Sequence, residues 1–170
     1  MKGPFVITGF MGCGKSEVAR SLAIQLKAAM VDLDQVITAE EGRSPAELIS
    51  EDGEPAFRTI ENRILTRVFL EGSARVISLG GGAWIESSNR ELIQRQGATS
   101  IWIDTPFEIC WSRIETDSND RPLGRTREQA SALFDHRRPT YALADVCLPA
   151  TGDESADDLA TRIVDELNRH

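Results

Sequence analysis

The segment GFMGCGKS, residues 9–16, combines glycines, a lysine and a serine at the spacing of a phosphate-binding loop. It matches G-x-x-x-x-G-K-[ST] at every fixed position, after an apolar stretch (PFVIT) and at the start of a helical pattern (GKSEVARSLAIQL). In such a loop, backbone N–H groups surround phosphate oxygens, the lysine reaches the β- and γ-phosphates, and the hydroxyl ligates Mg²⁺. The sequence therefore predicts a nucleoside triphosphate site. Its candidate residues are Gly12, Cys13, Gly14, Lys15, Ser16 and Glu17.

Kinases, GTPases and ATPases all use loops of this type. A GTPase is expected to carry an Asn-Lys-x-Asp segment that reads guanine, and none of the chain's lysines (Lys2, Lys15 and Lys27) stands in one. A mechanical ATPase usually has more chain than these 170 residues. The remaining interpretation is a kinase that binds ATP and a second, small substrate.

Two carboxylates in the segment VDLD are candidates for the chemistry of transfer. Strand periodicity would place Asp32 and Asp34 on the same side at the end of a strand, where ligands of parallel sheets bind. Their proximity would raise one pKa unless a cation lies beside them. We therefore expect Asp32 in the Mg²⁺ shell with Ser16, and Asp34 as the base that accepts the proton of the attacking hydroxyl. Asp104, at the end of TSIWID, is the second candidate for the metal side.

Composition limits the remaining possibilities. The formal net charge of −8 argues against a nucleic-acid binder. The sequence contains no run of about 18 apolar residues, so it predicts no membrane span. The first residues lack the apolar stretch and cleavage site of a signal peptide, so a cytoplasmic location is expected. The cysteines are odd in number and lack metal-ligand spacing, which indicates free thiols at Cys13, Cys110 and Cys147.

The chain alternates short apolar strands with helical patterns. Strands are expected at residues 4–8, 28–34, 74–79, 99–104 and 144–148, and helices at 14–26, 44–72 (broken near Gly53), 106–114 and 153–170. This alternation predicts an α/β domain with a parallel sheet covered on both faces. Residues 117–138 are rich in charge and contain no strand pattern, so they are expected to be a mobile segment.

Together with the phosphate-binding loop, five short segments resemble the shikimate kinase family: VDLD (31–34), FRTIE (57–61), LGGGA (79–83), RPL (121–123) and RRPTYALAD (137–145). The resemblance implies ATP-dependent phosphorylation of the 3-hydroxyl of shikimate. It also implies one P-loop domain over residues 1–170, with five parallel strands in the order 2-3-1-4-5. The substrate-binding region is expected at about 33–61 and a lid at about 117–138, in a monomer that binds neither nucleic acid nor membrane.

The resemblance assigns the acceptor site to two arginines. Arg58 would bind the carboxylate of shikimate, with Glu61 orienting its guanidinium group, and Arg137 would bind the same carboxylate. A planar guanidinium suits this bidentate contact better than an ammonium group does. Taken alone, Arg58 and Glu61 are three residues apart and equally typical of a surface ion pair on a helix. Arg138 is expected to be a solvated neighbour.

The remaining site residues also rest on the resemblance. Gly80, Gly81 and Gly82 follow a strand next to the phosphate-binding loop, where backbone without Cβ atoms would contact the polyhydroxy ring. Arg121 matches the lid arginine that reaches the transferring phosphate, and Arg113 resembles the arginine that stacks on adenine.

Two other functions are compatible with parts of this pattern. Carboxylate-binding arginines would suit a kinase for another hydroxy acid, such as gluconate. A non-catalytic nucleotide-binding regulator could share the fold, but it should have lost at least one of Lys15, Ser16, Asp32, Asp34 and Arg121, all of which are present.

Overall fold

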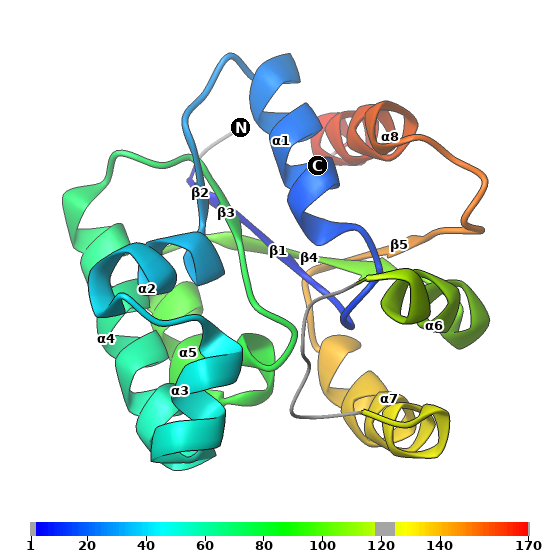
Figure 1. The fold of residues 1–170 in the computed structure, drawn as a ribbon. Coiled ribbons are helices and arrows are strands. Elements are labelled where there is room, and N and C mark those ends of the chain that lie inside the picture. Colours follow the sequence, from blue (N-terminus) through cyan, green and yellow to red (C-terminus); the bar gives the residue numbers. More distant parts are fainter. Residues whose placement is uncertain (1–2, 118–124, 170) are drawn as a thin grey trace.

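The computed structural model describes residues 3–117 and 125–169 (Figure 1). Within this range, five parallel strands form one sheet in the order β2-β3-β1-β4-β5. This confirms the fold class and strand order that the sequence predicts. The strands are β1 (Phe5–Thr8), β2 (Met30–Asp32), β3 (Val76–Ser78), β4 (Thr99–Asp104) and β5 (Val146–Pro149).

Helices cover both faces of the sheet. α1 and α8 lie together on one side, α5 and α7 on the other, and α2, α3 and α4 form a group beyond β2 (Figure 1). None of the described helices is long and apolar enough to cross a membrane. The helices are α1 (Lys15–Gln25), α2 (Leu33–Glu41), α3 (Pro45–Asp52), α4 (Glu54–Glu71), the 3₁₀ turn η1 (Ala83–Ile85), α5 (Ser87–Arg95), α6 (Phe107–Thr116), α7 (Arg127–Tyr141) and α8 (Ala156–Asn168).

The core forms because the central strands are apolar on both sides. All residues of β1 and β3 are buried, as expected for strands that have helices on both faces. The break expected near Gly53 is confirmed. This glycine ends α3 and precedes α4 with a φ of 89°, a conformation that other residues rarely adopt. The cysteines at 13, 110 and 147 are free, as predicted.

Three helical regions were not expected from the sequence, and the first is α2, which begins at Leu33 inside the segment expected to be a strand (28–34). α5 and η1 follow the glycines after β3, and α7 fills much of the segment that was expected to be a charged, mobile lid. α7 begins with a capping box in which Thr126 and Gln129 bond each other's backbone N–H groups. Its polar surface and Pro139, near its C-terminal end, hide the helical pattern.

Candidate active site

A cavity of about 1290 Å³ opens at the carboxyl ends of the strands, and we call it the main cavity. Every predicted site residue in the described part of the chain lines it. Arg121 lies outside the described residues. The predicted residues in the lining are Gly12, Cys13, Gly14, Lys15, Ser16, Glu17, Asp32, Asp34, Arg58, Gly80, Gly81, Gly82, Arg113 and Arg137.

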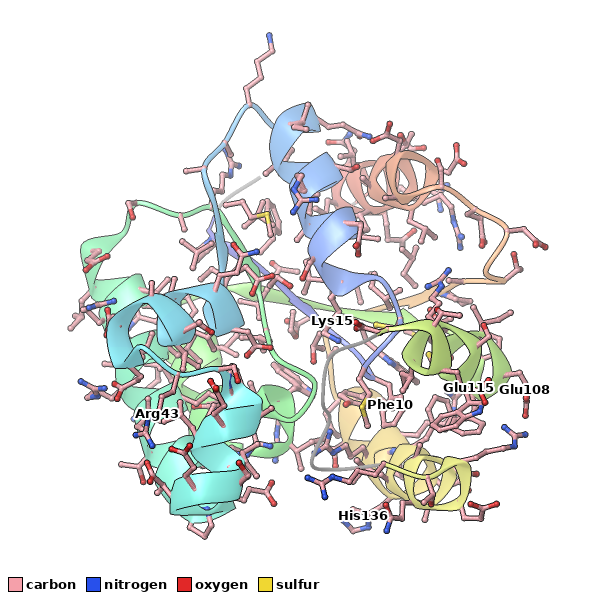
Figure 2. All side chains as sticks on the ribbon, viewed as in Figure 1. Phe10, Lys15, Arg43, Glu108, Glu115 and His136 are labelled. Carbon is pink, nitrogen blue, oxygen red and sulfur yellow. The ribbon has the colours of Figure 1, made fainter. Side chains whose placement is uncertain are left out.

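The phosphate-binding loop joins β1 to α1. Gly12 and Gly14 have φ values of 76° and 93°, so glycine is required for the backbone itself. A Cβ at Gly12 would lie 2.6 Å from the carbonyl oxygen of Cys110, so the loop also has no room for a side chain there. Lys15 Nζ donates a hydrogen bond to the carbonyl oxygen of Phe10 at 2.9 Å. Figure 2 shows Lys15 and Phe10 near the middle of the molecule.

Asp32 forms the end of β2 and the cap of α2. Its Oδ2 accepts a hydrogen bond from Ser16 Oγ at 2.6 Å, and its Oδ1 accepts from the backbone N–H groups of Asp34 at 3.1 Å and Gln35 at 3.3 Å. Asp34 therefore lies in the first turn of α2, so the expectation that strand periodicity aligns it with Asp32 was wrong. Both carboxylates still line the main cavity, because α2 starts directly at the sheet edge.

The pair of Ser16 and Asp32 fits a magnesium ion bound together with nucleotide phosphates. The two side chains place a hydroxyl and a carboxylate within 2.6 Å of each other, and hard oxygen ligands are those that Mg²⁺ prefers. The described residues contain no group of three or more His, Cys, Asp or Glu side chains that could hold a metal ion by themselves. Such a sparse protein ligand set suits an ion that keeps water and phosphate oxygens.

Arg58 and Glu61 meet on α4, as the resemblance implies. Arg58 Nη1 donates to both carboxylate oxygens of Glu61, at 2.9 and 3.1 Å, and the Glu61 side chain is only 1% exposed. Burial lowers the pKa of Arg58, but the charges and hydrogen bonds of Glu61 and Glu54 outweigh it and raise the pKa. Arg58 therefore stays a cation inside the site.

Glu61 is buried enough for its protonation to change near neutral pH. Burial raises its pKa to about 7, although the nearby Arg58 partly opposes this shift. The negative charges of Asp34 and Glu86 raise the pKa further. The site therefore contains a carboxyl group that titrates in a range where an exposed glutamate is fully ionised.

Gly80 and Gly82 leave room for functional side chains. A Cβ at Gly80 would lie 2.7 Å from Asp34 Oδ1, and a Cβ at Gly82 would overlap Arg58 Nη2. Neither glycine has a positive φ, so space, and not backbone conformation, excludes larger residues. The glycine segment (residues 80–82) lies at the cavity, as the sequence predicts. Protein side chains lie where Cβ atoms of Gly80 and Gly82 would be, and contact of the segment with the substrate stays a prediction.

Arg137 projects from α7 next to the same glycine segment. Its Nη1 lies 3.7 Å from the position a Cβ would take at Gly81, and the residue is 6% exposed. Tyr141 donates its hydroxyl to the carbonyl oxygen of Gly81, and Trp84 Nε1 donates to the carbonyl oxygen of Thr140 at 2.9 Å. Among residues 3–117 and 125–169, no carboxylate forms an ion pair with Arg137. The guanidinium group of Arg137 is therefore buried at the cavity wall and can bind an anion.

Arg138 is exposed, as the sequence suggested, but it is also paired. Its two terminal nitrogens donate to the two carboxylate oxygens of Asp104, with Nη2 to Oδ2 at 2.9 Å. Its guanidinium group also lies over the ring of Trp102, 4.9 Å from the centroid. Asp104 therefore binds α7 and does not line the main cavity, which favours Asp32 for the metal side.

The far end of the main cavity is formed by α6 and the loop before α8. Arg113 Nη1 donates to the carbonyl oxygen of Gly12 at 3.1 Å, so it lies across the phosphate-binding loop. Glu154 also lines this end, and it is not among the site residues that the sequence predicts. Its Oε2 accepts from the backbone N–H groups of Thr151 and Gly152 at 2.8 and 3.1 Å. The run TGDES, with its turn-forming residues, was the available signal.

Comparison with known proteins agrees with this geometry. The sequence profile of the shikimate kinase family matches residues 11–168. A shikimate kinase of Cereibacter sphaeroides is 37% identical over 170 residues, covering 98% of this chain and 83% of that protein. One of Ruegeria pomeroyi is 36% identical over 165 residues, covering 95% of this chain and 83% of that protein.

Solved structures give the same result. The shikimate kinase from Acinetobacter baumannii in complex with shikimate has a TM-score of 0.90 and 29% identity, covering 98% of this chain and 93% of that chain. A gluconokinase from Sinorhizobium meliloti 1021, with a TM-score of 0.60 and 14% identity, shares the fold alone. With the family profile matching nearly the whole chain and close relatives above 35% identity, the chain belongs to the shikimate kinase family.

Proposed function

We propose that the main cavity binds Mg·ATP over residues 12–17 and shikimate between α2, α4, the glycine segment and α7. The activity is that of the family: the chain uses ATP to phosphorylate the 3-hydroxyl of shikimate. One observation carries the assignment of the two sites. Lys15, Asp34, Arg58 and Arg137 come from four separate elements and line one cavity.

At the nucleotide end, backbone N–H groups of the loop and of the α1 N-terminus bind phosphate oxygens. Lys15 exchanges its bond to the Phe10 carbonyl for the β- and γ-phosphates and neutralises charge as it develops. Ser16 and Asp32 would hold Mg²⁺, which supplies charge neutralisation and orients the phosphates when bound. Arg113, which already contacts the loop, would cover the adenine.

At the acceptor end, Asp34 acts on the hydroxyl that is phosphorylated. Its carboxylate lies directly against Gly80, and its position at the start of α2 keeps it beside Asp32. We assign Asp34 as the group that orients the 3-hydroxyl and accepts its proton as the bond to phosphorus forms. Because phosphoryl transfer needs little covalent assistance, this positioning is most of what the residue supplies.

Arg58 and Arg137 hold the carboxylate of shikimate from two sides. Arg58 comes from α4 and Arg137 from α7, and the glycine segment lies beside both. Two guanidinium groups give geometric selection as well as charge, since each can make paired hydrogen bonds to a planar carboxylate. A cation with no carboxylate partner among the described residues, as Arg137 is, gains most from such a ligand.

A coupled assay of ADP release tests the proposal with shikimate, with gluconate and with no acceptor. Rapid turnover is expected with shikimate only. Preference for gluconate would overturn the acceptor assignment, and equal ADP release in all three conditions would indicate an ATPase. Three further statements remain predictions: that Arg121 is a lid residue, that the protein is a monomer and that it is cytoplasmic. Light scattering tests the monomeric state.

A further inference from the structure

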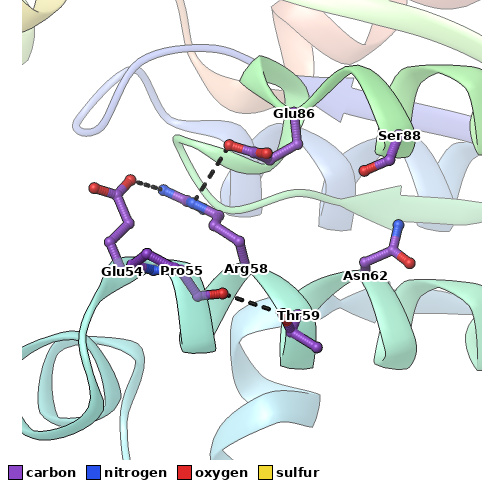
Figure 3. Close-up of a pocket in the computed structure, with 7 residues that line it drawn as sticks. All are labelled: Glu54, Pro55, Arg58, Thr59, Asn62, Glu86 and Ser88. Atoms are coloured by element: carbon purple, nitrogen blue, oxygen red, sulfur yellow. Dashed lines mark hydrogen bonds and ion pairs between the residues drawn. The ribbon is translucent and has the colours of Figure 1, made fainter.

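A second, smaller cavity of about 580 Å³ lies on the other side of Arg58 (Figure 3). Glu54 and Glu86 form part of its wall, and Arg58 lines both this cavity and the main one. Figure 3 shows the guanidinium group between the two glutamates, with an interaction drawn to each. Arg58 therefore has a side that faces carboxylates of the protein as well as a side that faces the acceptor site.

Two of the three nitrogens of the Arg58 guanidinium group already donate to carboxylates. Nη1 donates to both oxygens of Glu61, and Nη2 donates to Glu54 Oε1 at 3.1 Å. The third nitrogen, Nε, is buried and lies 4.0 Å from Glu86 Oε1, too far for a hydrogen bond. One positive charge thus faces three carboxyl groups, so a further carboxylate meets repulsion unless one of them moves away.

The three glutamates differ in how easily they can move. The Glu61 side chain is 1% exposed, whereas those of Glu54 and Glu86 are 43% and 42% exposed. Glu54 is the first residue of α4, and burial does not hold its side chain in place. Because Glu61 keeps hold of Nη1, releasing Glu54 frees Nη2 without freeing the arginine.

We propose that Glu54 holds Nη2 of Arg58 from the side of the second cavity when no acceptor is bound, and that the carboxylate of the acceptor takes this nitrogen over from the main cavity. The displaced Glu54 stays in the second cavity, which it already lines. This inference rests on the proposed role of Arg58. Exchange of one carboxylate for another keeps the arginine paired, whereas a neutral polyol offers nothing to replace the lost ion pair. Glu54 thereby lowers the affinity of Arg58 for every ligand, and only an anionic ligand can replace Glu54.

Calorimetric titration of shikimate into Glu54→Gln tests the exchange. Removing the competitor should tighten shikimate binding by about 3–5-fold, the range for a partly exposed ion pair, and leave ATP affinity unchanged. Structural damage would weaken binding, so a gain separates competition from misfolding. Unchanged or weaker shikimate binding in a variant with a normal melting temperature overturns the inference.

Two matched variants separate direct occupation from net charge. Glu54→Asp keeps the charge but shortens the side chain, so it should tighten binding as Glu54→Gln does. Glu71→Gln removes the same charge at the other end of α4 and should have no effect. Wild-type affinity in Glu54→Asp, or equal tightening in Glu71→Gln, would show a general charge effect and overturn direct occupation.

Arg58→Ala, measured in parallel, separates failure of this inference from failure of the proposed site. If Arg58→Ala leaves shikimate affinity unchanged, the assignment of Arg58 to the substrate carboxylate is wrong. If Arg58→Ala weakens binding but Glu54→Gln does not tighten it, the site stands and only the competition by Glu54 fails. In the double variant, Glu54→Gln should no longer tighten binding, because its partner is absent.

Discussion

The two ends of the main cavity differ in the groups that they present: backbone groups at the nucleotide end and side chains at the acceptor end. At the nucleotide end, a contiguous loop presents backbone groups and the start of α1, with glycines at φ values that other residues rarely adopt. At the acceptor end, charged side chains converge from α2, α4 and α7 onto glycines that have no positive φ and leave room for these side chains. Backbone recognition is local in sequence and insensitive to pH, whereas the acceptor end depends on long-range packing and on ion pairs.

The largest loss is expected for Lys15→Met at the nucleotide end. In the proposed function this lysine neutralises charge on the transferring phosphate, so turnover should fall by more than about 10³-fold while the protein stays folded. Steady-state kinetics and thermal unfolding check both statements. If the variant kept most of the wild-type rate, the loop would not be the site of transfer.

Asp34→Asn addresses the boundary between the two ends. We expect kcat to fall by about 10²–10⁴-fold, with ATP affinity nearly unchanged, because the proposed function assigns Asp34 to the hydroxyl and not to the phosphates. Asp32→Asn is the matched control, and it should weaken Mg·ATP binding instead. The opposite pattern in the two variants would exchange their assigned roles.

Arg58→Ala and Arg137→Ala should each weaken shikimate binding by about 1.5–3 kcal/mol, the cost of a lost charged hydrogen-bond partner. ATP binding should hardly change, since neither residue contacts the phosphate-binding loop through a hydrogen bond or ion pair. Titration calorimetry with each ligand measures the two effects separately. Unchanged shikimate affinity in both variants would contradict the carboxylate clamp.

The nucleotide end was predictable from sequence because its information is contiguous. Residues 9–16 contain the glycines, the lysine and the hydroxyl, and flanking patterns fix the strand and the helix on either side. The acceptor end required the family resemblance. The residues near Gly82 in the sequence do not indicate that the side chain of Arg58 lies against this glycine. The ion pair of Arg138 with Asp104 likewise joins residues 34 positions apart.

α7 shows why part of the acceptor end escaped prediction. Charge from residue 117 onward suggested a mobile segment, yet Arg127–Tyr141 is helical because Thr126 and Gln129 cap it and tertiary contacts hold it. Its buried positions include Ala130 and Tyr141, but the buried residue between them is an arginine, which does not count in an apolar pattern. Arg137, which we propose binds the acceptor, thus weakened the apolar pattern that would have predicted α7.

The pH dependence of stability should differ between the wild type and Glu61→Gln. The pKa of Glu61 is raised from 4.5 to about 7 in the folded protein. Between these values the folded state binds more protons at this residue than the unfolded state, so its contribution to stability falls as pH rises from about 5 to 7. Melting temperatures at pH 5, 6, 7 and 8 should therefore decline less across the series in Glu61→Gln. Parallel curves for the two proteins would contradict the raised pKa.

The smallest expected effect concerns the support of Arg137. Arg138, the next residue on α7, holds the helix to the end of β4 through Asp104, but its side chain is 46% exposed and that of Asp104 is 18% exposed. A pair this open is screened by solvent and contributes at most about 1 kcal/mol. Arg138→Ala should therefore raise the KM for shikimate by no more than about 5-fold and leave the KM for ATP unchanged.

Asp104→Asn removes the other partner of the ion pair with Arg138, and it also tests the difference between the two ends of the main cavity. If Asp104 serves α7, its variant should match Arg138→Ala, with a modest effect confined to shikimate. The double variant should then cost no more than either single one, because both changes remove one interaction. Weakened Mg·ATP binding in Asp104→Asn alone would instead place this carboxylate on the metal side. The nucleotide end would then depend on a distant side chain too, and its contrast with the acceptor end would fail.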